Sequence, residues 1–132
     1  MYAEQLGGEL LADELSPQEQ LGCLTRRLWM AARLAVDTGI HVRRWTRAEA
    51  VRFFEANTFA PPRMIEQEVD RLSVWPAQAT AYHVGYLAFR RLRDERVGAS
   101  GSIDSVRSFH DRLFRVGPVP VEMLSMAFNE TP

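Results

Sequence analysis

The sequence predicts an all-α fold, a single helical domain of about six or seven helices over residues 1–132. Apolar residues recur three and four positions apart through most of the chain, which is the spacing of one helix face. Proline and glycine residues separate these segments, as they do in turns between helices. No segment alternates apolar and polar residues over the length of a strand, so we expect essentially no sheet. The length of 132 residues suits one hydrophobic core.

The first two segments of the chain are predicted to be helices. A helical segment over residues 2–15 comes first and is interrupted by two glycines. Ser16 then precedes a proline, and Glu19 follows three positions later, which is the pattern of a capping box at a helix start. We expect this second, long helix to run to about Thr38, where Gly39 can adopt the left-handed conformation that ends many helices.

The long helix carries one regular apolar stripe. The stripe repeats at intervals of three and four residues and consists of Leu21, Leu24, Leu28, Ala31 and Ala35. Further apolar side chains lie on its other faces. We therefore expect a central helix that is buried on most sides.

Five more helices complete the predicted fold. Thr46 and Glu49 form a second capping box, and Trp75-Pro76 breaks one helix and starts the next. The expected ranges are residues 46–57, 61–74, 76–96 and 103–116, with a flexible loop over 97–102 and a short last helix through Phe128.

Composition and charge exclude several classes of function. The net charge is -1, so nothing indicates a nucleic-acid surface or an anionic membrane as partner. All basic residues are arginines, and the densest cluster of them is interleaved with acidic residues, which favours a solvated helix face. The single cysteine, Cys23, excludes an internal disulfide and is typical of a reducing compartment. No signal peptide or transmembrane segment is recognisable, so we expect a cytoplasmic protein.

The common catalytic and metal-binding motifs do not occur in this sequence. His41, His83 and His110 are far apart, and there is no HExxH or CxxC pattern, so we expect no metal site built by this chain alone. A serine-hydrolase elbow of the GxSxG type and a glycine-rich phosphate loop are also missing.

One polar set on the long helix has a pattern that a pocket would show. Arg26, Arg33 and Asp37 are separated by seven and four residues and lie on one stripe, and His41 follows one turn later. Charged side chains on an otherwise apolar helix are typical of a pocket lining. The alternative is an Arg33–Asp37 ion pair that satisfies a half-buried arginine, and spacing alone favours this alternative.

Several strings in the sequence match a known family in order and without large gaps. Residues 32–41, A-R-L-A-V-D-T-G-I-H, are similar to the family's A-R-L-V-V-D-T-G-I-H, and residues 75–82 to its P-G-Q-A-x-S-Y box. Weaker matches are residues 2–7 with the end of E-G-W-A-L-Y-A-E-Q-L-G, 68–71 with E-V-x-R, 109–111 with F-H-D, and 118–124 with L-P-L-x-x-L. By these motifs the chain resembles the bacterial family called domain of unknown function 885.

The resemblance implies a helical scaffold related to zinc metallopeptidases of the zincin type. In such proteins an HExxH helix holds the metal, and the glutamate of that helix activates water. The resemblance places HExxH and a third, glutamate ligand upstream of Tyr2. This chain would then correspond to the C-terminal part of a longer family member. It would acquire zinc only if completed by a partner or an upstream segment that carries HExxH.

The resemblance also implies roles for four residues. Tyr82 matches the tyrosine of the P-G-Q-A-x-S-Y box and is expected to be the catalytic oxyanion donor. The residues expected to line the pocket and orient substrate are Arg33, Asp37 and His41. The sequence departs from the family pattern at two positions, because His83 stands where lysine is frequent and Ala77 stands where glycine is usual.

Two functions remain open at this point. The first is the substrate-pocket half of a metallopeptidase-like protein, inactive alone, with an HExxH-bearing half as partner and a peptide-like substrate after assembly. The alternative is a stand-alone helical binding module that has lost peptidase chemistry and forms a homodimer. A metal-independent catalyst that uses the same four residues has no supporting motif.

Overall fold

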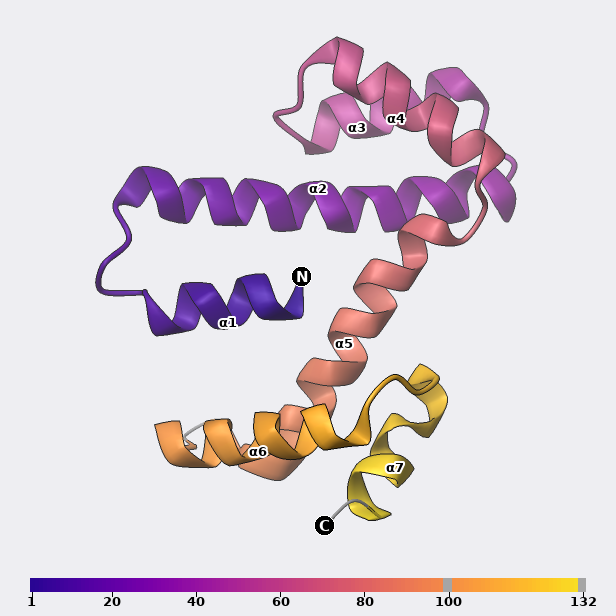
Figure 1. The fold of residues 1–132 in the computed structure, drawn as a ribbon. Coiled ribbons are helices and arrows are strands. Elements are labelled where there is room, and N and C mark those ends of the chain that lie inside the picture. Colours follow the sequence, from indigo (N-terminus) through magenta and orange to yellow (C-terminus); the bar gives the residue numbers. More distant parts are fainter. Residues whose placement is uncertain (99–100, 131–132) are drawn as a thin grey trace. The chain divides into compact units, whose positions relative to one another are not determined.

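The computed structural model describes residues 1–98 and 101–130, and these residues form helices and connecting turns without a strand. The predicted all-helical fold class is confirmed. Part of the expected loop over residues 97–102 lies outside the described residues. In chain order the elements are α1 (Tyr2–Leu10), α2 (Pro17–His41), α3 (Arg47–Asn57), α4 (Pro62–Val74), α5 (Gln78–Val97), α6 (Ile103–Val116), the 3-10 turn η1 (Val121–Met123) and α7 (Leu124–Glu130) (Figure 1).

The chain divides into two compact units, residues 1–84 and residues 85–132. Helix α5 belongs to both, because the division falls between Val84 and Gly85. Each unit is described by itself below. The organisation as one domain stays a prediction. None of the helices in the described part of the chain has the length and apolar content needed to cross a membrane.

Both capping boxes predicted from the sequence are present. At the start of α2, the Ser16 hydroxyl accepts a hydrogen bond from the Glu19 backbone N–H at 3.3 Å, and the Glu19 carboxylate accepts from the Ser16 N–H at 2.9 Å. At the start of α3, Thr46 and Glu49 make the same reciprocal pair at 3.3 and 2.8 Å. These caps use only neighbouring residues, which is why the sequence locates them correctly.

The predicted end of α2 is wrong by about one turn. The helix continues to His41, and Gly39 is part of it. A Cβ atom at Gly39 would lie 2.3 Å from Cε3 of Trp45, so the glycine gives the indole ring room against the helix. The left-handed residue comes later, at Arg44, with a φ of 58°. Gly39 is therefore explained by side-chain packing and not by helix termination.

The core of the first unit lies between α2, α3 and α4. Trp29 of α2 stacks against Phe54 of α3, with ring centroids 4.8 Å apart. The other buried apolar residues of this core are Met30, Ala32, Val36, Ala50, Ile65, Val69, Leu72 and Ala79. Helix α1 lies beside the N-terminal half of α2 but buries no residue of its own (Figure 1).

The expectation that α2 is buried on most sides is wrong for its N-terminal half. Leu21, Leu24 and Leu28 are 60%, 59% and 40% exposed. Helix α2 has two apolar faces, and the core contains the one with Trp29 and Val36. The bulkier Trp29 ring offers more apolar area for burial against α3 than the leucines do. The leucines remain on the surface.

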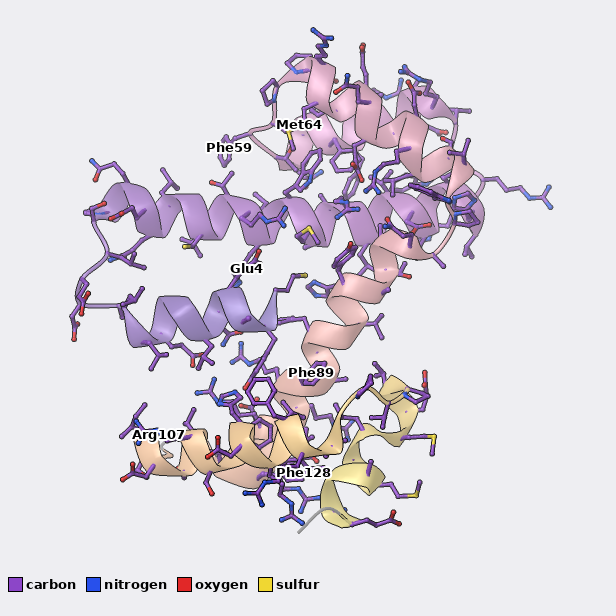
Figure 2. The ribbon with its side chains drawn as sticks, viewed as in Figure 1. Glu4, Phe59, Met64, Phe89, Arg107 and Phe128 are labelled. Carbon is purple, nitrogen blue, oxygen red and sulfur yellow. The ribbon has the colours of Figure 1, made fainter. Side chains whose placement is uncertain are left out.

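The second unit has a small core of its own between α6, α7 and the C-terminal part of α5. Phe109 of α6 packs against Phe128 of α7, with ring centroids 5.2 Å apart, and Leu92 of α5 and Leu124 are also buried (Figure 2). The guanidinium of Arg112 lies 5.0 Å from the Phe128 ring centroid. None of the residues with a predicted functional role lies in this unit.

Candidate functional site

The four residues with predicted roles all lie in the first unit. Arg33, Asp37 and His41 occupy successive turns near the end of α2, and Tyr82 lies near the start of α5. Two contacts connect members of the set: the Arg33 guanidinium lies 5.4 Å from the Tyr82 ring centroid, and Asp37 lies 3.7 Å from His41. Arg26, which spacing placed on the same stripe, is instead 3.5 Å from Glu4 of α1.

Arg33 is nearly buried, and its partner is Glu68 of α4. The Arg33 Nε donates to Glu68 Oε1 at 2.7 Å, and Nη1 contacts the Met30 sulfur at 3.2 Å. The predicted Arg33–Asp37 ion pair is therefore wrong. Helical side chains lean toward the N-terminus of their helix, which directs Arg33 toward Met30 and away from Asp37.

Glu68 forms ion pairs with two arginines. Its Oε1 accepts from Arg33, and Arg71 donates to both of its carboxylate oxygens, at 2.7 and 3.2 Å. Burial alone would raise the pKa of Glu68, but the hydrogen bonds and charges of Arg71 and Arg33 outweigh burial and hold that pKa below its ordinary range. The carboxylate is thus charged at neutral pH and fixes both guanidinium groups. The sequence analysis assigned no role to Glu68 or Arg71, although they are the first and last residues of the weak family match at residues 68–71.

The Asp37 carboxylate forms a hydrogen bond with the backbone of the turn that precedes α5. The side chain is 2% exposed, and Oδ1 accepts a hydrogen bond from the Ala77 backbone N–H at 3.1 Å. Ala77 has a φ of 66°, in the left-handed region that favours glycine. This conformation explains why glycine is the usual residue in the P-G-Q-A box. The second oxygen, Oδ2, is buried and has no hydrogen-bond partner among the described residues.

His41 presents a hydrogen-bond acceptor in its neutral form. Its Nε2 lies 2.8 Å from the Leu72 carbonyl oxygen. Because a carbonyl oxygen can only accept, we infer that Nε2 carries the hydrogen and Nδ1 the lone pair. The side chain is 27% exposed. In this neutral form, Nδ1 can accept a hydrogen bond from a ligand.

Tyr82 combines a positioned ring with an open hydroxyl. The residue is 47% exposed, and its hydroxyl has no hydrogen-bond partner within the described part of the chain. One turn earlier on α5, Gln78 accepts a hydrogen bond from Arg71 at 3.0 Å. Arg71 and Arg33 thus each contact a residue in the first turns of α5, and the phenol can donate to a bound group.

The comparison with family models decides the assignment. Residues 1–127 match the model described as "Bacterial protein of unknown function (DUF885)". The chain belongs to this family. The predicted resemblance is confirmed, while a zincin-like relationship stays a prediction. Neither the curated proteins nor the solved structures gave a significant match.

The polar cluster of this DUF885 chain brings two possible zinc ligands, Asp37 and His41, near each other. The described residues contain no group of three or more His, Cys, Asp or Glu side chains placed to hold a metal. Asp37 and His41 are the only two candidate ligands in the polar cluster that approach each other, and the Nε2 of His41 is used by a carbonyl. We therefore derive no step through zinc from these residues.

Two surface hollows of this DUF885 chain lie near α2, away from the cluster. One, of about 400 Å³, lies between α1 and α2 and includes Glu4 and Leu24 in its lining (Figure 2). The other, of about 330 Å³, is bordered by Trp29 and by Phe59 and Met64, which lie next to each other in Figure 2. None of the four predicted residues lines either hollow.

Proposed function

We propose that this chain is the substrate-pocket half of a metallopeptidase-like protein and is not catalytic alone. The observation that carries the proposal is the arrangement of Arg33, Asp37, His41 and Tyr82. These side chains come from two helices: Arg33 lies against the Tyr82 ring, His41 lies 3.7 Å from Asp37, and Asp37 accepts a hydrogen bond from the Ala77 N–H. In this proposal Tyr82 donates to the oxyanion of the tetrahedral intermediate, and the other three orient a peptide-like substrate.

Local chemistry supports these roles. An oxyanion donor must be free to donate, and the Tyr82 hydroxyl has no partner among the described residues. In its neutral form His41 has an acceptor at Nδ1, and such an acceptor suits an N–H group of a peptide backbone. Zinc, in this proposal, comes with a partner or an upstream segment that carries HExxH.

The test mixes this chain with a second protein segment from the same organism. That segment carries HExxH and covers the part of a DUF885 protein that precedes the region matched by this chain. Copurification, bound zinc by mass spectrometry and cleavage of a defined peptide mixture are measured for each part and for the pair. We expect no cleavage by either part and cleavage by the pair. Cleavage by this chain alone, or a zinc-loaded pair that cleaves no peptide, contradicts the proposal.

The role of Tyr82 is tested in the active pair. Tyr82→Phe removes only the hydroxyl, and losing one oxyanion donor should lower kcat by about 10²-fold or more. Tyr86→Phe, in the second unit, is the matched control and should leave kcat unchanged. Equal kcat values for Tyr82→Phe and the unmodified chain would reject the oxyanion role while leaving the assembly proposal intact.

A second candidate function, a stand-alone helical binding module, is favoured by a different observation. Leu21, Leu24 and Leu28 form an exposed apolar stripe on a well-formed helix. Large exposed apolar stripes mark surfaces that contact another protein.

A further inference from the structure

The exposed stripe of α2 has the spacing of a coiled-coil contact. We call it the leucine seam; its members repeat at intervals of three and four and are Leu21, Leu24, Leu28, Ala31 and Ala35. The three leucines are at least 40% exposed. Arg26 and Arg33 lie outside the seam, because they bind Glu4 and Glu68, whereas Arg27 borders it. The seam is thus an apolar contact surface without acidic side chains in it.

Side-chain size changes along the seam in a way that fits an antiparallel copy of itself. Its N-terminal half is leucine and its C-terminal half is alanine. If two α2 helices pair antiparallel about Leu28, Leu21 of one copy meets Ala35 of the other, and Leu24 meets the region of Ala31. Leu21 and Leu24 then each face a small side chain, while Leu28 meets its own copy at the axis; alternating large and small residues is how packed helix pairs fill space. A parallel pairing would place leucine on leucine and leave gaps between alanines.

The charges at the two ends of α2 are complementary in the same pairing. Every charged side chain before Arg26 is acidic, and Asp13 and Glu14 lie just before α2. Arg43 and Arg44 lie just after it, nearly as many residues from Leu28 in the other direction. None of these four side chains forms an ion pair within the described residues. Antiparallel pairing brings the acidic end of each copy to the basic end of the other.

We propose that the leucine seam is the interface of a homodimer in which two α2 helices pack antiparallel across a two-fold axis near Leu28. The occupant is a second copy because both the side-chain sizes and the end charges are complementary to themselves under this symmetry. One helix pair buries less surface than a standard stable interface, so the dimer is reversible and concentration-dependent. This inference develops the second candidate function and does not depend on peptidase activity.

Sedimentation velocity over a concentration series tests whether the seam dimerises. We expect the unmodified chain to pass from monomer to dimer, and Leu24→Glu to remain monomeric because the substitution buries an unpaired carboxylate at the contact. Phe114→Glu is the matched control, since Phe114 is 81% exposed but lies on α6; it should dimerise normally. Circular dichroism checks that each variant is folded. A monomer at all concentrations, or a Leu24→Glu dimer, overturns the proposal.

A charge exchange tests the antiparallel direction. The double variant Arg43→Glu/Arg44→Glu has acidic groups at both ends of α2, and Asp13→Arg/Glu14→Arg has basic groups at both ends. Each variant should dimerise more weakly than the unmodified chain because like charges meet. An equimolar mixture should form heterodimers, since unlike charges then meet at both ends. Variants that self-associate as well as the unmodified chain, or mix without heterodimer, contradict this direction.

Cross-linking locates the two-fold axis. In a Cys23→Ser background, Leu28→Cys lies at the axis and should form an intermolecular disulfide under mild oxidation. Leu21→Cys is the control: the two copies of residue 21 would lie roughly 21 Å apart along the helix axis, from a rise of 1.5 Å per residue. A disulfide from Leu21→Cys and none from Leu28→Cys would exclude the proposed pairing. Because no readout measures cleavage, failure here leaves the peptidase proposal unaffected.

Discussion

At the scale of single residues, Ala77 has a backbone conformation that its side chain disfavours. Its φ of 66° brings Cβ close to the neighbouring carbonyl, which costs roughly 1–2 kcal/mol for an L-residue. Ala77→Gly relieves this strain and should therefore stabilise the chain by about 1 kcal/mol. The gain is reduced because glycine has more conformational freedom in the unfolded state. Equilibrium unfolding in urea measures this change.

Ala81→Gly is the matched control for Ala77→Gly. Ala81 is exposed and lies inside α5, with ordinary helical surroundings. The same substitution there should destabilise the chain by about 1 kcal/mol, because glycine is a poor helix former. If both glycine variants are destabilised alike, the turn at residues 75–77 does not have the left-handed conformation described above.

The shared carboxylate of Glu68 is predicted to matter far more than an exposed one. Glu68→Gln leaves two guanidinium groups without a charged partner, and Arg33 is almost buried, so we expect a loss of about 3 kcal/mol in unfolding free energy. Asp70→Asn breaks the exposed Arg47–Asp70 pair, whose atoms are 2.7 Å apart, and should hardly move the urea midpoint. Equal losses for the two variants would show that the burial of Glu68 has no energetic consequence.

Glu68 also predicts an acid dependence of stability. Its pKa in the folded chain lies below the ordinary glutamate value of 4.5, so the unfolded chain binds more protons in acid. The stabilisation is complete above the ordinary value and is lost as pH falls through the lower, folded-state pKa. Unfolding free energy should drop as pH falls below the ordinary glutamate value of 4.5, and this drop should be shallower in Glu68→Gln. Parallel pH profiles for the two proteins would contradict the assignment.

At the scale of elements, the glycines of α2 provide a test of packing. Gly39→Ala would place a Cβ 2.3 Å from the Trp45 ring, and the displaced indole should cost about 2 kcal/mol. Gly22→Ala meets nothing within 4 Å in the same helix and should stabilise it by about 1 kcal/mol. Thermal unfolding of the two variants gives opposite shifts in Tm. A rise in Tm for Gly39→Ala would mean that Trp45 does not pack against α2.

Helix α2 also shows what could be predicted from sequence and what could not. Its start was predictable because Ser16 and Glu19 bond only to neighbouring backbone groups. Its buried face was not, because the helix has two apolar faces and only the presence of Phe54 decides between them. The end near Gly39 was misassigned for the same reason: the need for glycine comes from Trp45, six residues later.

At the scale of the whole molecule, the candidate site was predictable only in part. Spacing placed Arg33 and Asp37 on one stripe of the long helix and His41 just past its expected end, and the family motif added Tyr82. The partners Glu68 and Arg71 come from α4, whose position against α2 depends on tertiary packing. No local pattern encodes that contact. The confirmed membership in the DUF885 family is likewise a statement about the chain as a whole, since the match covers residues 1–127.

The sharing of one carboxylate by two arginines constrains the order in which this chain can change during evolution. Losing Arg71 first leaves Arg33 and Glu68 as an intact pair, 2.7 Å apart. Losing Glu68 first leaves both Arg33 and Arg71 without their carboxylate partner, and Arg33 is nearly buried. Accepted substitutions should therefore begin at Arg71 and reach position 68 only after position 33 has become uncharged. Substitutions at positions 71, 33 and 68 should therefore accumulate in that order.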